Sequence, residues 1–133
     1  MQSLTFETVN DALVAVVPEL REQYQKELQW WKGERPGPYN IFGYVLNPVL
    51  TSLLKGERND EDTLYRIFRF FEEMATSDNP EVVNLLQVEE LETLVAETSL
   101  AAAAWKYMGP ATKALARETA KIWHWERNLP EGT

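Results

Sequence analysis

The stretch DEDTLYRIFRFFEEMATSDNPEVVNLLQVEELETLVAE, residues 60–97, contains the densest apolar pattern of the chain and decides its fold. Its first half repeats apolar side chains at three- and four-residue spacing, which places them on one face of an α-helix. These residues are Leu64, Ile67, Phe68, Phe71, Met74 and Ala75. Asn59 or Asp60 supplies an N-cap. The sequence SDNP at 77–80 ends this helix and begins another, because proline cannot continue a helix but suits its first position.

The second half of the stretch predicts a partner helix with its own apolar face. That face is formed by Val82, Val83, Leu86, Leu91, Leu94 and Val95. The apolar phase slips near Val88, so we expect a bend or a break there. A short connection between two helices makes them antiparallel neighbours. Neither helix can bury its apolar face alone, so the hairpin requires further helices packed against it.

The remaining segments also show helical patterns, and no segment alternates apolar and polar residues as a half-buried strand would. We expect helices over 5–16, 18–31, 39–54, 99–108 and 111–127, the third kinked or divided at Pro48. In the last helix, Leu115, Ile122 and Trp123 are the predicted inward residues. The sequence therefore predicts an all-α fold: one domain over 1–133, a bundle of about six to seven helices stacked as antiparallel helical hairpins. Residues 128–133 are expected to form a flexible tail.

Composition restricts the classes of protein that this chain can represent. Its 133 residues suit one domain, and the 44% hydrophobic content suits a globular core. The absence of cysteine excludes disulfides and thiolate chemistry and agrees with a cytoplasmic location. No apolar run is long enough to span a membrane, and the N-terminus does not resemble a secretory signal. An isoelectric point near 4.7 argues against direct binding of nucleic acid or of anionic membranes.

The negative charge is concentrated in the central stretch. Twelve acidic and three basic residues lie between Glu57 and Glu97, a net charge of −9, whereas the whole chain carries −8. The rest of the chain is therefore close to neutral. Two interpretations remain open: a solvated surface that promotes solubility, or a docking face for a basic partner.

The sequence offers little material for catalysis. The one histidine, His124, lies between two tryptophans and has no partner motif, so we interpret it as a packing or surface residue. Carboxylate pairs at three-residue spacing occur at Glu19 and Glu22, at Asp78 and Glu81, and at Glu89 and Glu92. Such pairs also arise by chance in a chain with 21 acidic residues. We expect no catalytic residues, no metal site and no cofactor.

Five tryptophans are unusual in a chain of this length. Because adjacent residues on a helix point about 100° apart, one of Trp30 and Trp31 is expected in the core and the other partly exposed. Filling of the core explains most tryptophans, since each buries a large area. The alternative is that one or two anchor a binding partner, as tryptophan does at many binding hot spots.

Several blocks together resemble a family of small all-helical bacterial proteins of uncharacterised function. They are PELREQYQKELQWW at 18–31, GERPGPYN at 33–40, FRFFEEMATSDNPEVVNLLQVEELETL at 68–94 and GPATKALARETAKIW at 109–123. The likeness covers nearly the whole chain, from about Phe6 to Trp123. It carries over no activity and no catalytic residue. In general character, small and acidic and helical, these proteins look like the immunity proteins of bacterial toxin–immunity systems.

From these observations the leading hypothesis is a non-catalytic, cytoplasmic protein-binding module. In its specific form it is an immunity protein that neutralises a cognate toxin, or another basic protein, through an acidic helical surface. The residues expected to bind the partner are Glu72, Glu73, Asp78, Glu81, Glu89, Glu90, Glu92 and Trp30. One alternative is a structural or adaptor protein that forms a homodimer through an apolar helix face. A carboxylate-metal hydrolase ranks third.

Overall fold

A computed structural model describes residues 4–32 and 34–132, and this part of the chain is helical without any strand. The α-helices are α1 (Val9–Val16), α2 (Arg21–Trp30), α3 (Pro38–Ile41), α4 (Asn47–Leu54), α5 (Glu61–Ala75), α6 (Pro80–Leu85), α7 (Glu92–Val95), α8 (Thr98–Trp105) and α9 (Pro110–Trp123). Two π-helical segments, η2 (Phe42–Leu46) and η3 (Leu86–Leu91), join α3 to α4 and α6 to α7. Short 3-10 turns, η1 (Pro18–Leu20) and η4 (Glu126–Asn128), precede α2 and follow α9. The predicted all-α single-domain fold is confirmed. None of the described helices has the length and apolar character needed to cross a membrane.

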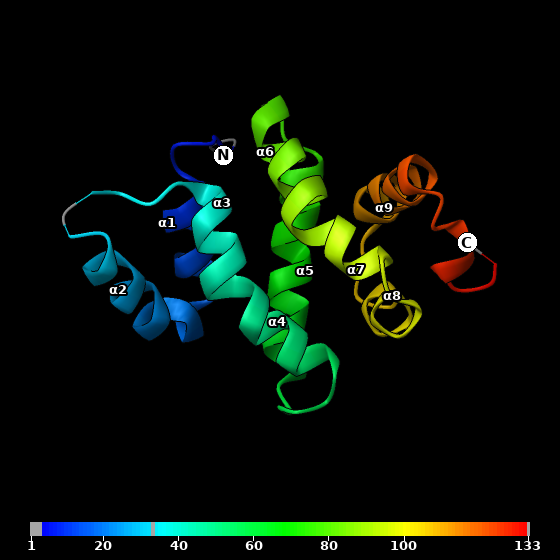
Figure 1. Cartoon of the computed structure of the whole chain (residues 1–133), viewed down its shortest axis with the longest axis horizontal. Helices are drawn as coiled ribbons and strands as arrows, with labels where there is room; N and C mark the ends of the chain where they lie inside the picture. The colour runs from blue at the N-terminus through cyan, green and yellow to red at the C-terminus, as the bar shows by residue number, and fades with distance from the viewer. Residues whose placement is uncertain (1–3, 33, 133) are drawn as a thin grey trace.

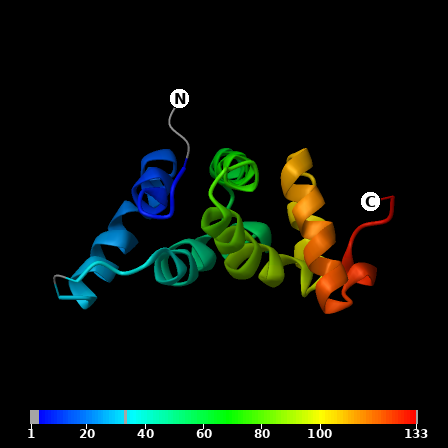
Figure 2. The same cartoon turned by 90° about the horizontal axis from the view of Figure 1, so that it is seen from above.

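Helix α5 is the centre of the bundle. It contacts α1, α4, α6 and α9, and Figure 1 shows it running between the N-terminal and C-terminal helices. Viewed from above, α3–η2–α4 and α6–η3–α7 cross on one side of α5 (Figure 2). The face that α5 turns inward carries the buried side chains Leu64, Ile67, Phe68, Phe70, Phe71 and Met74. The predicted apolar face is therefore confirmed, with Phe70 added to it.

The predicted ends of the central hairpin are also confirmed. The Asp60 carboxylate accepts a hydrogen bond of 3.1 Å from the backbone N–H of Thr63, which caps α5. The Asn79 side chain accepts one of 2.9 Å from the backbone N–H of Glu81, and Pro80 is the first residue of α6. Asparagine and proline therefore act together as the start signal of the second helix.

Both π-helical segments occur where the sequence predicted irregularity. The apolar phase slips near Val88 because η3 winds more loosely than an α-helix, so residues on either side of it still face the core. Segment η2 ends directly before Asn47 and Pro48. The ring of Pro48 would clash with the carbonyl four residues earlier in a regular helix, and the wider η2 turn accommodates it.

The C-terminal region departs from the prediction in two respects, the orientation of Ile122 and Trp123 and the end of the last helix. Ile122 and Trp123 are 59% and 48% exposed, so their predicted inward orientation is wrong. The inner face of α9 is instead formed by the small residues Thr112, Ala116, Thr119 and Ala120, which allow α9 to approach its neighbours closely. The helix ends at His124, whose backbone is left-handed with φ 62°, rather than near residue 127.

The tail predicted over 128–133 begins with an anchored residue. The Asn128 side-chain amide donates hydrogen bonds of 2.9 Å to the Val95 carbonyl and 3.2 Å to the Ala96 carbonyl. Leu129 packs against the core. These contacts fasten the segment after α9 to the end of α7. Residue 133 lies outside the described residues.

Candidate functional site

The eight residues predicted to bind a partner fall into three structural environments. Glu73, Asp78, Glu81 and Trp30 are exposed, Glu72, Glu89 and Glu92 are half-buried, and Glu90 is buried. Because some of these carboxylates are buried or half-buried, the predicted surface contains fewer exposed carboxylates than the sequence suggested.

Glu72 is part of the scaffold, because its carboxylate caps the N-terminus of α9. It accepts hydrogen bonds from the backbone N–H of Ala111 at 2.9 Å and from the backbone N–H and hydroxyl of Thr112 at 2.9 and 2.8 Å. Burial raises the pKa of Glu72, but these hydrogen bonds outweigh it and leave the pKa below its usual value. Helix dipole and hydrogen bonds both stabilise the charged form there.

Glu90 does not contribute its charge to the acidic surface. Its side chain, on η3, is only 1% exposed, and its Oε2 atom has no hydrogen-bond partner. Burial raises the pKa of Glu90 well above its usual value, and the neighbouring charge of Glu89 adds to the effect. The sequence places Glu90 beside Glu89 in an acidic run, but the looser winding of η3 turns it inward.

Glu89 lies where η3 meets η2, and Glu92 is the first residue of α7. The Asn47 side-chain amide donates a 3.2 Å hydrogen bond to the Glu89 carbonyl. A Cβ atom added to Gly43 would lie 3.4 Å from the Glu89 carboxylate, so these two segments are in close contact. Burial, and then the charge of Glu92, raises the pKa of Glu89. The carboxylates of Glu89 and Glu92 are therefore close enough for the charge of one to affect the other.

Glu73, Asp78 and Glu81 are gathered by the turn between α5 and α6, at the end of the hairpin where Figure 1 places the start of α6. All three are exposed. Within the described residues neither they nor Glu89 and Glu92 form an ion pair. We call these five residues the hairpin carboxylates.

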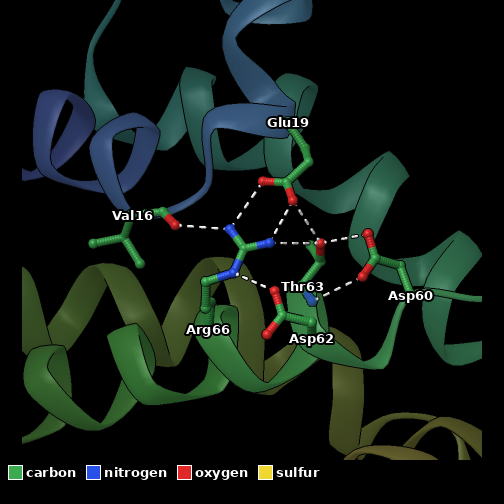
Figure 3. A network of polar contacts seen from close by, with 6 residues as sticks. All are labelled: Val16, Glu19, Asp60, Asp62, Thr63 and Arg66. Carbon is green, nitrogen blue, oxygen red and sulfur yellow. Dashed lines mark hydrogen bonds and ion pairs between the residues drawn. The ribbon is translucent and has the colours of Figure 1, made fainter.

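The ion pairs of the described chain lie on its N-terminal half. The largest network joins the start of α5 to η1 and the end of α1 (Figure 3). The Arg66 guanidinium donates to both carboxylate oxygens of Glu19, to Asp62 at 2.9 Å and to the Val16 carbonyl at 3.0 Å. These hydrogen bonds lower the pKa of Glu19 to about 2. One carboxylate of the predicted Glu19–Glu22 pair is thus engaged in holding helices together.

The exposed indole of Trp30 lines a groove that is rich in aromatic residues. Trp30 is 78% exposed and Tyr44, on η2, is 63% exposed. With Trp31, Glu27 and Asn40 they surround an open groove of about 530 Å³ between the end of α2 and the helix formed by α3 and η2. We call it the aromatic groove.

The sequence prediction of a partly exposed tryptophan is confirmed for Trp30, but the prediction that the other tryptophan of the pair lies in the core is wrong. Trp31 is half-buried, and its indole N–H donates a 3.0 Å hydrogen bond to the Glu27 carboxylate. Sequence reasoning missed Tyr44. The signal was its position between the inward residues Phe42 and Val45, which places it on the outer side of that helix.

Gly43 faces Glu89 and its neighbour Tyr44 lines the aromatic groove, so segment η2 contacts both Glu89 and the groove. Among the described residues, no group of three or more histidine, aspartate or glutamate side chains is arranged to hold a metal ion. The described surface therefore combines an exposed aromatic groove with carboxylates that form no ion pair among the described residues.

The fold and this surface define a class: a single small all-α domain with an acidic helical hairpin at its centre. The chain belongs to the family described as a domain of unknown function, DUF7674, whose family model matches residues 10–125. No curated protein and no solved structure matches the chain.

Proposed function

We propose that this protein is a non-catalytic binding module for a basic protein partner. The observation that carries the proposal is the set of hairpin carboxylates, which lie on one helical hairpin and form no ion pair among the described residues. A cluster of unpaired negative charge attracts a cationic partner and raises the rate at which the two proteins meet. Trp30 is exposed and suits the role of an apolar anchor.

In its specific form, the proposal is that the protein is an immunity protein and the partner its cognate toxin. Toxins that act on nucleic acids present basic clefts, and an acidic helical surface can cover such a cleft. Neutralisation would then occur by occlusion: the partner's cleft is blocked, and no bond is made or broken. The small all-α architecture and the net charge of −8 agree with this form of the proposal.

A second candidate is an adaptor that binds a copy of itself. The observation that favours it is the exposure of Ile122 and Trp123 at the end of α9, where Trp123 stacks on Trp125 at 5.4 Å between ring centroids. An exposed apolar patch of this kind is common at homodimer contacts. Light scattering of the purified protein distinguishes a monomer from this homodimer.

The test is capture of a partner from the native host with the tagged protein, followed by mass spectrometry. A variant bait carries Glu73→Lys, Asp78→Lys and Glu81→Lys. The control bait carries Glu118→Lys, Glu126→Lys and Glu131→Lys, which make the same change in net charge at exposed positions elsewhere. We expect one basic protein with the wild-type and control baits and much less of it with the variant bait. Recovery of the protein itself alone would contradict the proposal and favour the adaptor.

A further inference from the structure

We infer that the aromatic groove is a recognition site for an arginine side chain of the protein partner. The inference rests on the proposed function for the source of that arginine. The chemistry of the groove itself can be tested without the partner.

The aromatic groove is lined by side chains that suit a cation. Three of its lining side chains are aromatic, Trp30, Trp31 and Tyr44, one is the carboxylate Glu27, and one is the amide Asn40. No basic side chain of the described residues lines it. Aromatic faces carry negative charge density and attract cations, and a carboxylate beside them adds to the same sign of potential.

Two other aromatic residues of this chain, Trp105 and Tyr107, are covered by cations of the chain itself. Where Trp105 is partly exposed, the chain covers it with its own cations: Lys113 lies 5.7 Å and Arg117 5.9 Å from its ring centroid. Tyr107 has Lys106 at 5.1 Å. Trp30 and Tyr44 are more exposed than these two residues, yet neither has a cation over its ring within residues 4–32 and 34–132.

An arginine side chain suits this groove better than a lysine side chain does. A planar guanidinium stacks flat on an indole ring and still directs N–H donors sideways, whereas an ammonium is a point charge with stronger hydration. Glu27 uses its Oε2 atom to accept from the Trp31 indole. Its second oxygen is available to accept from a guanidinium, and that hydrogen bond already fixes the carboxylate at the groove.

Segment η2 carries the groove residue Tyr44 directly after Gly43, which faces Glu89, one of the hairpin carboxylates. A basic protein that approaches the carboxylates can place one arginine between Trp30 and Tyr44. The carboxylates provide long-range attraction, and the groove provides a short-range contact with defined geometry.

The test is an NMR titration of the isolated full chain with N-acetyl-arginine amide, following the indole N–H signal of Trp30. The neutral isostere N-acetyl-citrulline amide and the lysine analogue are titrated in parallel. We expect the arginine probe to shift the Trp30 signal, the citrulline probe not to shift it, and the lysine probe to bind more weakly. Equal shifts from arginine and citrulline, tighter binding of lysine, or no shift up to the solubility limit would each overturn the inference.

Variants locate the binding. Read from the indole N–H signal of Trp31, which also lines the groove and is kept in every variant, Trp30→Leu and Tyr44→Leu should each weaken binding of the arginine probe by about threefold. The two together should weaken it by about tenfold, the range of cation–π contacts at exposed sites. Trp123→Leu removes an indole that is 48% exposed and lies outside the groove, so it should change nothing. All these side chains are exposed, so the variants should keep the wild-type circular dichroism spectrum.

The two proposals fail in different ways. If the arginine probe binds but no protein partner is captured, the proposed function is wrong while the groove chemistry stands. If a partner is captured and binds Trp30→Leu as tightly as the wild type, the groove is not its arginine site, and the hairpin carboxylates carry the interaction without it.

Discussion

Glu90 shows how one residue of an acidic run acquires a separate role. Its carboxyl group is buried on η3 and lacks a partner at Oε2, and burial raises its pKa well above the usual value. The folded state therefore holds a proton that the unfolded state releases near pH 4.5. Because the folded state binds more protons in that range, its stability falls as pH rises from about 4.5 through the folded pKa.

We predict that Glu90→Gln removes this loss of stability with rising pH. Its free energy of unfolding, relative to the wild type, should rise with pH by up to about 1.4 kcal/mol per pH unit over that range. Urea unfolding at a series of pH values measures the slope. Glu90→Leu should flatten the pH dependence in the same way, and Glu73→Gln, at an exposed position, should leave it unchanged. Parallel curves for wild type and Glu90→Gln would refute the assignment.

Glu72 and Gly109 form a contact pair whose coupling energy can be measured. A Cβ atom at Gly109 would lie 2.5 Å from the Cδ and Oε1 atoms of Glu72, so an alanine there pushes the capping carboxylate away from α9. We predict that Glu72→Ala costs roughly 2 kcal/mol of stability through its lost hydrogen bonds. Gly109→Ala should cost a similar amount alone, but only a few tenths of a kcal/mol in the Glu72→Ala background. If the two losses of stability add in this double-mutant cycle, Gly109 is not required to make room for the capping carboxylate of Glu72.

At the scale of elements, the Arg66 network fastens α5 to the end of α1 and to η1. Thr63 completes it, since its hydroxyl donates to Asp60 and lies within 2.9 Å of Glu19. We predict a coupling energy on the order of 1 kcal/mol between Glu19→Ala and Arg66→Ala, below that of a buried pair because the Glu19 side chain is 39% exposed.

The network also predicts a response to acid. The pKa of Glu19 is lowered to about 2 in the folded protein, so its contribution is complete above about pH 4.5 and is lost as pH falls toward 2. Glu19→Gln should therefore reduce the loss of stability between pH 4.5 and pH 2. A denaturant titration at these two pH values measures the loss of stability in each protein. An equal loss in the variant and the wild type would contradict a role of Glu19 in acid unfolding.

The elements of the fold were predictable from sequence because local signals fixed their ends. Asp60, Asn79 and Pro80 act through the backbone beside them, and their effects were predicted correctly. The orientation of Ile122 and Trp123 was not predictable, because it depends on how closely α9 approaches α5. The same limit applies to the site: Trp30 follows from helical spacing, but the burial of Glu90 follows from the winding of η3, and the capping role of Glu72 follows from a contact 39 residues away.

At the scale of the whole molecule, charge is distributed unevenly over the bundle. Residues 57–97 carry a net charge of −9, and α9 carries the exposed basic residues Arg117 and Lys121 on its outer side. Three of the carboxylates in the acidic stretch, Asp60, Glu72 and Glu90, are committed to the interior or to a cap. The field that a partner meets therefore comes mainly from the exposed members of the stretch, including the hairpin carboxylates.

The docking role of the acidic hairpin is tested by the association rate with the captured basic partner, measured by stopped flow at several salt concentrations. Glu73→Lys, Asp78→Lys and Glu81→Lys together should slow association by about tenfold or more at low salt and weaken its salt dependence, since steering acts through unscreened charge. The control with Glu118→Lys, Glu126→Lys and Glu131→Lys should associate much closer to the wild-type rate. Equal rates for the two variants would contradict a docking role for the acidic hairpin and would leave its charge as a solubilising surface.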